Sequence, residues 1–392
     1  MKILFYRYGS ICEPDILSYF NALGIKVIEE KTELYNKKFS SSPECVNKIN
    51  ELISMHSPLF VFTINFFPIV AEICHIHNVM YLCWTVDCPI LELFDKSIQY
   101  PTNRIFLFDK SQYDYFAPYN PDCIFYLPLA ANIERFNYAI QKISKLDTTN
   151  YAADISFVGS LYSEKNPLKQ LPELSEYARG YIDSIVETSL QIYGYNFIEE
   201  ALSDKFIEEF KKSNIIFSNE RLITNHERHT IAHQYIGHQI AETERIKTLN
   251  TLAKYFRVDL YTNSDTSVLQ NVHTHAPIES LYGMPKVFHL SKINLNMTIK
   301  PIKTGLPLRI FDIMGCGGFL MTNYQTELTD FFEIGKDLEC YSSIEELIDK
   351  CTYYLKHEDI RQQIALQGNR TISNYHTYPH RLNEMIKTIT SL

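Results

Sequence analysis

Short apolar runs separated by segments with helical spacing are the feature that most constrains the fold of this chain. A strand that is apolar along its whole length must be covered on both faces, and helices between successive strands supply that cover. Crossovers between parallel strands are right-handed in nearly all cases. The first part of the sequence therefore predicts a doubly wound α/β domain. Its expected strands are Lys2–Tyr6, Lys26–Glu29, Leu59–Ile64, Val79–Thr85, Arg104–Phe108 and Ile124–Leu127.

The same rhythm returns in the second half of the chain. We interpret the polar segment Gln141–Tyr151 as a linker, so that a first domain covers residues 1–145 and a second covers 152–375. Residues 168–240 show helical spacing without strand alternation and predict a helical insertion in the second domain. The carboxyl ends of two such sheets are expected to face a shared cleft. The expected strands are Asp154–Val158, Val258–Tyr261, Lys292–Met297 and Gly318–Thr322.

Charge and cysteine content exclude several classes of protein. The 392 residues carry a formal charge of −9, which disfavours a general nucleic-acid binder. The nine cysteines are odd in number and form no Cys-x-x-Cys pair, which favours free buried thiols in a reducing compartment.

Targeting and membrane signals are weak in this sequence. Arg7 interrupts the first apolar run too early for a secretory signal. The most apolar stretch, Pro58–Cys74, contains Asn65, Pro68 and Glu72 and makes a poor membrane span. We therefore expect a cytoplasmic, soluble protein.

The segment Ser291–Asn323 carries the strongest chemical signal. A strand is followed by a loop with Lys300 and Lys303, and a helix is expected to begin near Gly305. The free N–H groups of a helix start, together with nearby lysines, suit a diphosphate. An ordinary helix with a surface lysine loop explains the pattern equally well.

Two further strand ends carry candidate binding residues. Gly159 and Ser160 end a strand without a Cβ barrier, so that backbone can approach a phosphate closely. Trp84 can stack on a sugar ring while Asp87 accepts from its hydroxyls, although a core Trp with a turn-forming Asp is the favoured alternative. Asn65 can face the same cleft or cap the helix that follows it.

Four histidines lie between His226 and His238, and two of them, His229 and His233, share one helix face. That spacing can hold zinc, but Thr230 stands where the metalloprotease motif has Glu, and no Cys lies nearby. A solvated or locally paired helix face is favoured, and we predict no metal site. His273 and His275 are assigned to a loop.

Phosphate-loop, dinucleotide-binding and Asp-x-Asp signatures are missing from the sequence, which disfavours an ATPase, a dehydrogenase and a metal-dependent sugar transferase.

Several segments together resemble the CgeB-like, spore-maturation branch of group 1 glycosyltransferases. The resemblance covers most of the chain and is least distinctive in the helical insertion. Its motifs are SKINLN…GLPLRIFDIMGCGG at Ser291–Gly318, FVGSLY at Phe157–Tyr162, ERIKTL at Glu244–Leu249, VDLYT at Val258–Thr262, MPKVFHLSK at Met284–Lys292, HTYPHRL at His376–Leu382, NFFP at Asn65–Pro68, WTVDCP at Trp84–Pro89 and LPLAAN at Leu127–Asn132.

The resemblance implies a GT-B fold with a nucleotide-sugar donor on the second domain and an acceptor on the first. It also implies that a final helix, residues 376–392, returns to the first domain. Group 1 enzymes commonly carry Glu-x7-Glu, which here falls on Thr304 and Asp312, so that the first acid is missing. The expected donor residues are Gly159, Ser160, Lys165, Tyr261, Lys292, Asn296, Thr304, Gly305, Leu306 and Asp312. The expected acceptor residues are Asn65 and Trp84, and the expected catalytic residues are Asp87, Lys300, Lys303 and Arg309.

The functional hypothesis is a hexosyltransferase that uses a UDP-sugar, needs neither metal nor other cofactor, and retains the anomeric configuration. The acceptor can be a protein, a glycan or a small molecule. Two alternatives remain open. One is a GT-B epimerase or phosphorylase, and the other, favoured by Thr304, is a non-catalytic module that binds nucleotide-sugars.

Overall fold

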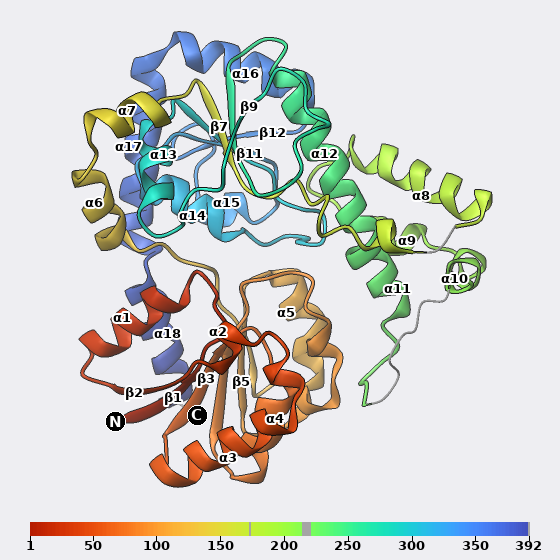
Figure 1. The fold of residues 1–392 in the computed structure, drawn as a ribbon, viewed down its shortest axis with the longest axis vertical. Coiled ribbons are helices and arrows are strands. Elements are labelled where there is room, and N and C mark those ends of the chain that lie inside the picture. Colours follow the sequence, from red (N-terminus) through yellow and green to blue (C-terminus); the bar gives the residue numbers. More distant parts are fainter. Residues whose placement is uncertain (172–173, 214–220, 391–392) are drawn as a thin grey trace. The chain divides into compact units, whose positions relative to one another are not determined.

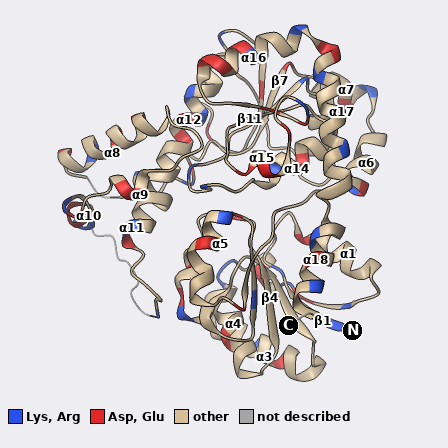
Figure 2. Cartoon of the chain, turned by 180° about the vertical axis from the view of Figure 1, so that it is seen from behind, with Lys and Arg blue, Asp and Glu red and all other residues tan. Residues whose placement is uncertain are grey.

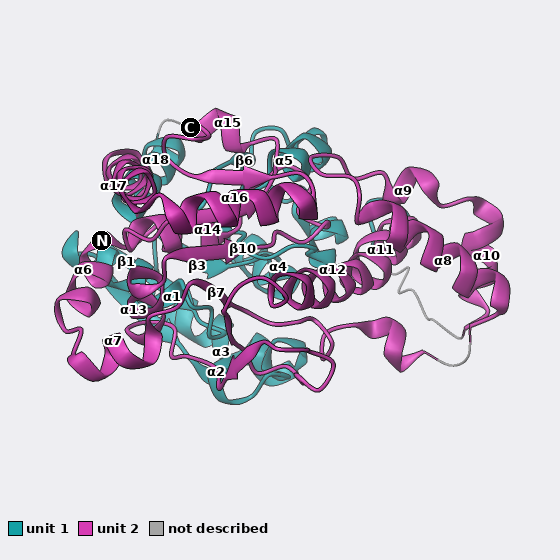
Figure 3. Cartoon of the chain, turned by 90° about the horizontal axis from the view of Figure 1, so that it is seen from above, with its two compact units in different colours: residues 1–129, 219–225, 378–392 teal, residues 130–218, 226–377 magenta. Residues whose placement is uncertain are grey.

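The computed structural model describes residues 1–171, 174–213 and 221–390, which form two compact units. Unit 1 consists of Met1–Leu129, Asn219–Asn225 and Tyr378–Leu392, and unit 2 consists of Ala130–Ser218 and His226–Thr377 (Figure 3). Residues 172–173 and 214–220 of the predicted insertion, and 391–392 of the predicted final helix, lie outside the described residues.

Unit 1 contains a six-stranded parallel sheet in the order β2-β1-β3-β4-β5-β6. All six predicted strands are confirmed, with bounds that shift by only a few residues. The strands are β1 (Lys2–Tyr6), β2 (Lys26–Glu30), β3 (Phe60–Ile64), β4 (Met80–Trp84), β5 (Asn103–Leu107) and β6 (Ile124–Tyr126). The helices between them are α1 (Glu13–Ala22), α2 (Thr32–Tyr35), α3 (Pro43–His56), α4 (Pro68–Ile76) and α5 (Lys110–Phe116).

Helices cover both faces of this sheet, as its apolar strands require (Figure 1). On one face, residues of α3 and α4 pack against alternate residues of the strands. On the other face, Phe20 of α1 meets Phe62 edge-on, with ring centroids 5.4 Å apart. Prolines at the starts of α3 and α4 fit the first helical turn, where the missing N–H costs nothing.

Unit 2 contains a second parallel six-stranded sheet, in the order β12-β11-β10-β7-β8-β9. Its strands are β7 (Ile155–Val158), β8 (Val258–Tyr261), β9 (His273–His275), β10 (Ile293–Asn296), β11 (Leu320–Asn323) and β12 (Glu339–Tyr341). The sequence analysis missed the two edge strands, β9 and β12. Neither is an apolar run, since β9 reads His-Thr-His and β12 reads Glu-Cys-Tyr, and the assignment of His273 and His275 to a loop was wrong.

The helices outside the insertion wind around this sheet (Figure 1). They are α6 (Ile133–Gln141), α7 (Lys145–Tyr151), α13 (Gly283–Leu290), α14 (Leu308–Gly315), α15 (Leu328–Phe331), α16 (Ile344–Lys356) and α17 (Glu358–Tyr375).

The described part of the predicted insertion is helical and has a hydrophobic core of its own. Its elements are α8 (Glu176–Ser189), α9 (Ile198–Ala201), α10 (Asp204–Lys211), α11 (Glu227–Thr230), a π-helical turn (Ile231–Ile236) and α12 (Gly237–Leu252). Ile182, Phe206, Phe210, Ile231 and Ile240 are among the buried residues of this core. α12 continues directly from the π-helical turn.

The boundary between the units lies between Leu129 and Ala130, not at residue 145. The segment interpreted as a linker contains helix α7, which begins with a capping box in which Ser144 and Asp147 bond each other's backbone N–H. The final helix, α18 (Tyr378–Thr390), belongs to unit 1. Its Asn383 Oδ1 accepts a hydrogen bond from Tyr19 Oη of α1 at 2.8 Å.

Basic and acidic side chains are interspersed over each unit (Figure 2). Within the described residues, no helix is long and apolar enough to cross a membrane. All nine cysteines are free thiols, and eight of them are buried, as the sequence predicted.

Two helical glycines of unit 2 provide a test of the packing. A Cβ added to Gly368 of α17 would lie 2.2 Å from Asp337 O, whereas one added to Gly180 of α8 would meet nothing within 4 Å. Helix propensity alone favours alanine at both positions by about 1 kcal/mol. We expect Gly368→Ala to lower the free energy of unfolding by about 1–3 kcal/mol, because backbone must shift. Gly180→Ala should raise it in the same denaturation experiment. Equal effects of the two substitutions would contradict the packing of α17.

Candidate functional site

The strand order of each sheet reverses at one point, and ligands of open parallel sheets bind outside the carboxyl ends of the strands there. In unit 1 the reversal lies between β1 and β3. Tyr8 follows β1 and Asn65 follows β3, while Asp87 follows the neighbouring strand β4. Three polar side chains from separate parts of the sequence therefore reach the same edge of the sheet.

These three side chains form one hydrogen-bonded cluster. Asn65 Nδ2 donates to Asp87 Oδ2 at 2.6 Å and to Tyr8 Oη at 2.8 Å, and Tyr8 Oη donates to Asp87 Oδ2 at 3.2 Å. Asn65 Oδ1 accepts from the N–H of Val86 at 2.9 Å. Burial and the Asp87 carboxylate raise the pKa of Tyr8 well above its ordinary value, so that its hydroxyl stays protonated.

Asn65 is held in the left-handed region, with φ 60°, a conformation that Asn tolerates better than most residues. It does not cap the following helix, since α4 begins at Pro68 and no side chain caps it. The capping alternative for Asn65 is therefore wrong, and its side chain instead faces Tyr8 and Asp87 within unit 1.

A pocket of about 430 Å³ opens beside this cluster. The volume lies in the range of small-molecule sites. Phenylalanine, proline and isoleucine side chains supply its apolar walls, and serine hydroxyls and carboxylates supply polar groups. It is lined by Tyr8, Ser40, Ser41, Asn65, Phe66, Phe67, Pro68, Ile69, Asp87, Pro89, Ile90 and Glu92.

Trp84 does not line this pocket, and the structure does not support its assignment as a stacking platform. Its side chain is 1% exposed, and Nε1 donates to Leu127 O at 3.1 Å. The ring packs edge-on against Tyr378 of α18. The side chain lies in the core because Trp84 is still part of strand β4, as its last residue, whereas Asp87 lies beyond the strand end.

The turn after β1, where many doubly wound domains bind phosphate, is already occupied in unit 1. The buried Glu13 Oε1 accepts from the N–H groups of Tyr8, Gly9 and Ser10 at 2.9, 2.9 and 3.1 Å. Arg7 Nε donates to the other carboxylate oxygen at 3.1 Å. A carboxylate of the chain itself thus fills the anion position.

In unit 2 the strand order reverses between β7 and β10. Gly159 and Ser160 follow β7, and Met297 follows β10. Arg245 of α12 joins these two strand ends, since it donates to Ser160 O at 2.6 Å and to Met297 O at 2.8 Å. Its guanidinium lies over the rings of Phe157 and Tyr162, 5.3 and 4.6 Å from their centroids. The sequence analysis missed Arg245 as a site residue, although it lies in the ERIKTL motif.

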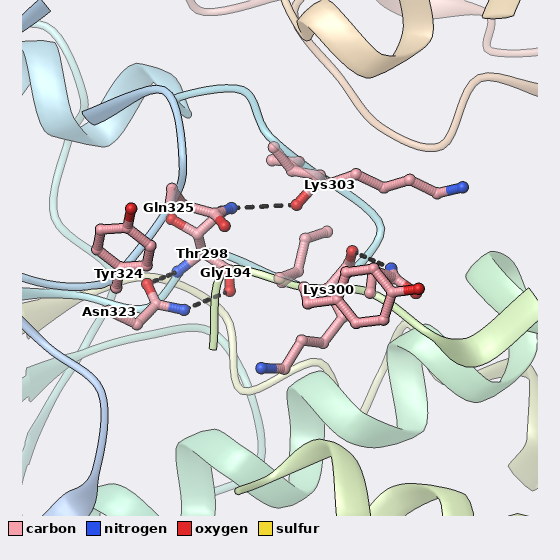
Figure 4. Close-up of a pocket in the computed structure, with 11 residues that line it drawn as sticks. Gly194, Thr298, Lys300, Lys303, Asn323, Tyr324 and Gln325 are labelled. Atoms are coloured by element: carbon pink, nitrogen blue, oxygen red, sulfur yellow. Dashed lines mark hydrogen bonds between the residues drawn. The ribbon is translucent and has the colours of Figure 1, made fainter. Parts of the chain in front are cut away.

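Lys300 and Lys303 lie in the loop after β10, but their side chains point in different directions (Figure 4). Lys300 is buried, and its Nζ donates to Ile192 O at 2.6 Å. Burial lowers the pKa of Lys300, while the buried Glu244 carboxylate opposes that shift. Lys303 Nζ pairs with Glu199 at 2.8 Å.

The segment that follows α8 in the insertion covers this lysine loop. Asn196 donates to Lys300 O, and Gly194, Tyr195 and Asn196 line one side of a small polar cavity. On its other side, Asn323 and Gln325 hold Thr298 O and Ile302 O at 2.9 and 3.0 Å (Figure 4). The cavity, of about 10 Å³, has room for about one water molecule and not for a nucleotide.

The helix expected to begin near Gly305–Leu306 begins slightly later in the structure. Its first residue is Leu308, and Pro307 is its N-cap. Arg309 and Asp312 are one turn apart on this helix and pair at 3.5 Å. Asp312 is 4% exposed, so that a contact with a ribose would require this pair to open. Burial lowers the pKa of Arg309 from its ordinary value.

Thr304 has an acidic neighbour that its sequence position does not reveal. Thr304 Oγ1 donates to Glu327 Oε1 at 2.7 Å, and Glu327 N donates to Thr304 O at 3.3 Å. Glu327 is buried and follows strand β11. No pattern in the sequence indicated this residue, because it is 23 positions from Thr304.

Four of the predicted donor residues either lie away from the carboxyl ends of β7 and β10 or are engaged in contacts within the fold. Lys292 precedes β10, at the opposite end of the strand, and forms an exposed pair with Asp154 at 2.7 Å. Asn296 is buried and donates to the hydroxyls of Thr298 and Thr322. The two others pack against aromatic rings: Tyr261 stacks on His275, and Lys165 lies over Tyr162.

Residues 243–387 match the model of a protein family described as glycosyl transferase-like. This segment includes Arg245, the lysine loop and α14 but not Gly159 or Ser160. The sequence matches no curated protein.

Solved structures resemble the chain over nearly its whole length. Sucrose-phosphate synthase from Thermosynechococcus elongatus has a TM-score of 0.55 and 10% identity, and the match covers 100% of this chain and 98% of that one. HepE from Anabaena in complex with UDP-glucose has a TM-score of 0.53, 10% identity and full coverage of both chains. A glycosyltransferase from Rickettsia africae has a TM-score of 0.53 and 10% identity, with coverage of 98% and 97%. Two parallel six-stranded sheets with flanking helices, matched over both halves, make this a GT-B fold.

Substitution of Arg245 tests whether it joins the two strand ends. In Arg245→Met, two loop carbonyls lose their donor, and we expect a loss of about 1–3 kcal/mol in the free energy of unfolding. Lys292→Met is the control, since an exposed ion pair contributes about 1 kcal/mol or less. If urea denaturation shows the same stability for both variants, Arg245 does not hold the site together.

Proposed function

We propose that this protein is a glycosyltransferase that moves a hexosyl group from a UDP-sugar to an acceptor. The observation that carries the proposal is the reversal of strand order in unit 2, where Arg245 joins the ends of β7 and β10. Lys300 lies in the loop after β10, and Arg309 lies in α14. The family match includes all three residues. HepE, which has the same fold, was solved with UDP-glucose.

The chemistry of sugar transfer explains why cations are needed there. Negative charge builds on the diphosphate as it leaves the sugar, and preorganised donors aimed at that charge lower the barrier. Arg245 is fixed by two carbonyls, so that it need not reorganise much during the reaction, whereas Lys300 exchanges its bond to Ile192 O for one to the diphosphate. Gly159 and Ser160 follow β7 beside Arg245. Lys303, Gly305 and Leu306 extend the same loop toward α14.

The acid that is missing at position 304 is supplied, in this proposal, by Glu327. Its carboxylate lies against the Thr304 hydroxyl, close to where the first acid of the Glu-x7-Glu pattern would stand. Asp312 keeps the role of the second acid and contacts the ribose once Arg309 turns toward the diphosphate. The substitution at Thr304 therefore no longer favours a non-catalytic binding module.

Unit 1 binds the acceptor in this proposal. Its phosphate turn is filled by Glu13, whereas its pocket presents Asp87 and the hydroxyls of Tyr8, Ser40 and Ser41. Asp87 orients an acceptor hydroxyl or takes its proton, and Asn65 fixes the carboxylate for that task.

The remaining features follow from the sequence and from its resemblance to group 1 glycosyltransferases. The reaction uses neither a metal nor another cofactor, retains the anomeric configuration, and takes place in the cytoplasm. The chain belongs, in this proposal, to the CgeB-like branch.

Thermal unfolding with UDP-, GDP-, ADP- and TDP-sugars tests donor binding. A ligand present at 100 times its dissociation constant stabilises the folded state by about 2.7 kcal/mol. We expect a shift with UDP-sugars, and we expect Lys300→Met to weaken donor binding by at least about tenfold through loss of a charge-assisted bond. Lys292→Met, at the other end of β10, is the matched control and should keep the wild-type shift. No shift with any donor would contradict the proposal, and binding without hydrolysis or transfer would support a binding module.

The role of Asp87 requires an assay of transfer with a radiolabelled sugar and candidate acceptors. Asp87→Asn keeps the size of the side chain but cannot take a proton, and we expect transfer to fall by about 100-fold or more. Donor-induced thermal stabilisation should remain at the wild-type level, because the donor site lies in unit 2. Unchanged transfer would remove Asp87 from the catalytic residues.

A further inference from the structure

Glu199 gathers the two histidines that share a helix face. His229 Nδ1 lies 3.2 Å from Glu199 Oε1, and His233 Nε2 lies 2.6 Å from the same oxygen. His229 is in α11, His233 is in the π-helical turn, and Glu199 is in α9. The local pairing expected from the sequence is confirmed, but its partner comes from a separate part of the insertion.

A positive charge already sits at this position. Lys303 Nζ lies 2.8 Å from Glu199 Oε1, so that one carboxylate oxygen has three nitrogen neighbours. The side chains of Glu199, His229 and Lys303 are 27%, 21% and 34% exposed, whereas His233 is 1% exposed. Solvent therefore reaches a site that has one side chain firmly buried.

We propose that Glu199, His229 and His233 bind a divalent transition-metal ion, best matched by zinc, which takes the place of the Lys303 ammonium. Within the described residues, their ligand atoms lie within 4.8 Å of one another. Two imidazoles and one carboxylate are a ligand set that zinc uses, with water in the fourth position. This inference does not depend on the proposed transfer reaction.

The ion makes bonds that the ammonium cannot make. An ammonium only donates hydrogen bonds, so that beside it the two imidazoles must satisfy themselves by donating to Glu199. A metal ion accepts lone pairs from both rings and from the carboxylate. Each ring keeps one hydrogen, which moves to its other nitrogen when the ion binds, so that the exchange is balanced without an oxidant or reductant.

The surroundings of His233 set the expected strength of binding. Histidine ligands usually donate their other N–H to an acceptor, which orients the ring. Nδ1 of His233 is buried and has no hydrogen-bond partner among the described residues. We therefore expect an affinity below that of closed structural zinc sites.

Metal binding would also change the contacts of the loop after β10, because Lys303 lies in that loop. The ion displaces Lys303 from Glu199, while Lys300 remains bonded to Ile192 O. The π-helical turn that carries His233 is a rare conformation that occurs frequently at functional sites.

Titration of the chelator-treated protein with Zn²⁺, followed by calorimetry, tests the site, and Co²⁺ provides a visible spectrum that reports coordination. We expect one ion per chain. Glu199→Gln and His229→Ala should each weaken binding by at least about tenfold, since even loss of a supporting contact costs that much. His273→Ala, which changes an exposed histidine in β9, is the control and should bind as wild type. Circular dichroism without metal verifies that each variant is folded.

Lys303→Met provides a second test in the opposite direction. Loss of the competing ammonium should raise the affinity for Zn²⁺ several-fold, whereas binding to scattered surface histidines would not change. The proposal fails if the wild type binds no more Zn²⁺ than Glu199→Gln, or if Lys303→Met leaves the affinity unchanged. Neither readout involves a sugar donor, so that failure here is separate from failure of the proposed function.

Discussion

The candidate site of unit 2 depends on the hydrogen bonds that the Arg245 guanidinium donates to the ends of two strands. Strands β7 and β10 pair with each other where the strand order reverses, and the loops that follow them lie beyond this pairing. Arg245 joins them through the carbonyls of Ser160 and Met297, and stacks on Phe157 and Tyr162. A planar group with donors in a fixed fork suits this task, which a flexible ammonium would perform less well.

Charged groups of the chain occupy ligand-like positions in both units. Glu13 fills the amide nest after β1, and Lys303 rests on Glu199 beside two imidazoles. Such contacts satisfy buried or partly buried polar groups in the absence of a ligand. They differ in how easily they can be exchanged: Glu13 is fully buried and bonded by three backbone groups, whereas Lys303 is a flexible, partly exposed side chain.

Secondary structure followed from the sequence wherever a hydrophobic period was long enough to read. Ten of the twelve strands in the described residues were predicted, and the two that were missed, His-Thr-His and Glu-Cys-Tyr, are not apolar runs. The candidate site was predicted in part. Asn65 and Asp87 lie together as proposed, while Trp84 lies in the core and Lys292 lies at the wrong end of β10. Whether a residue reaches the carboxyl edge of the sheet depends on where its strand begins and ends. The composition of the segment does not reveal these positions.

The sequence by itself determined the architecture, because strands that are apolar throughout must be covered on both faces. It also located the lysine loop and the Gly-Ser end of β7, which are local patterns. Only the tertiary structure decided which distant residues meet: Glu327 with Thr304, Glu199 with His229 and His233, and Arg245 with two strand ends. These contacts join segments tens of residues apart, and side-chain geometry, which a linear pattern does not encode, selects the partners.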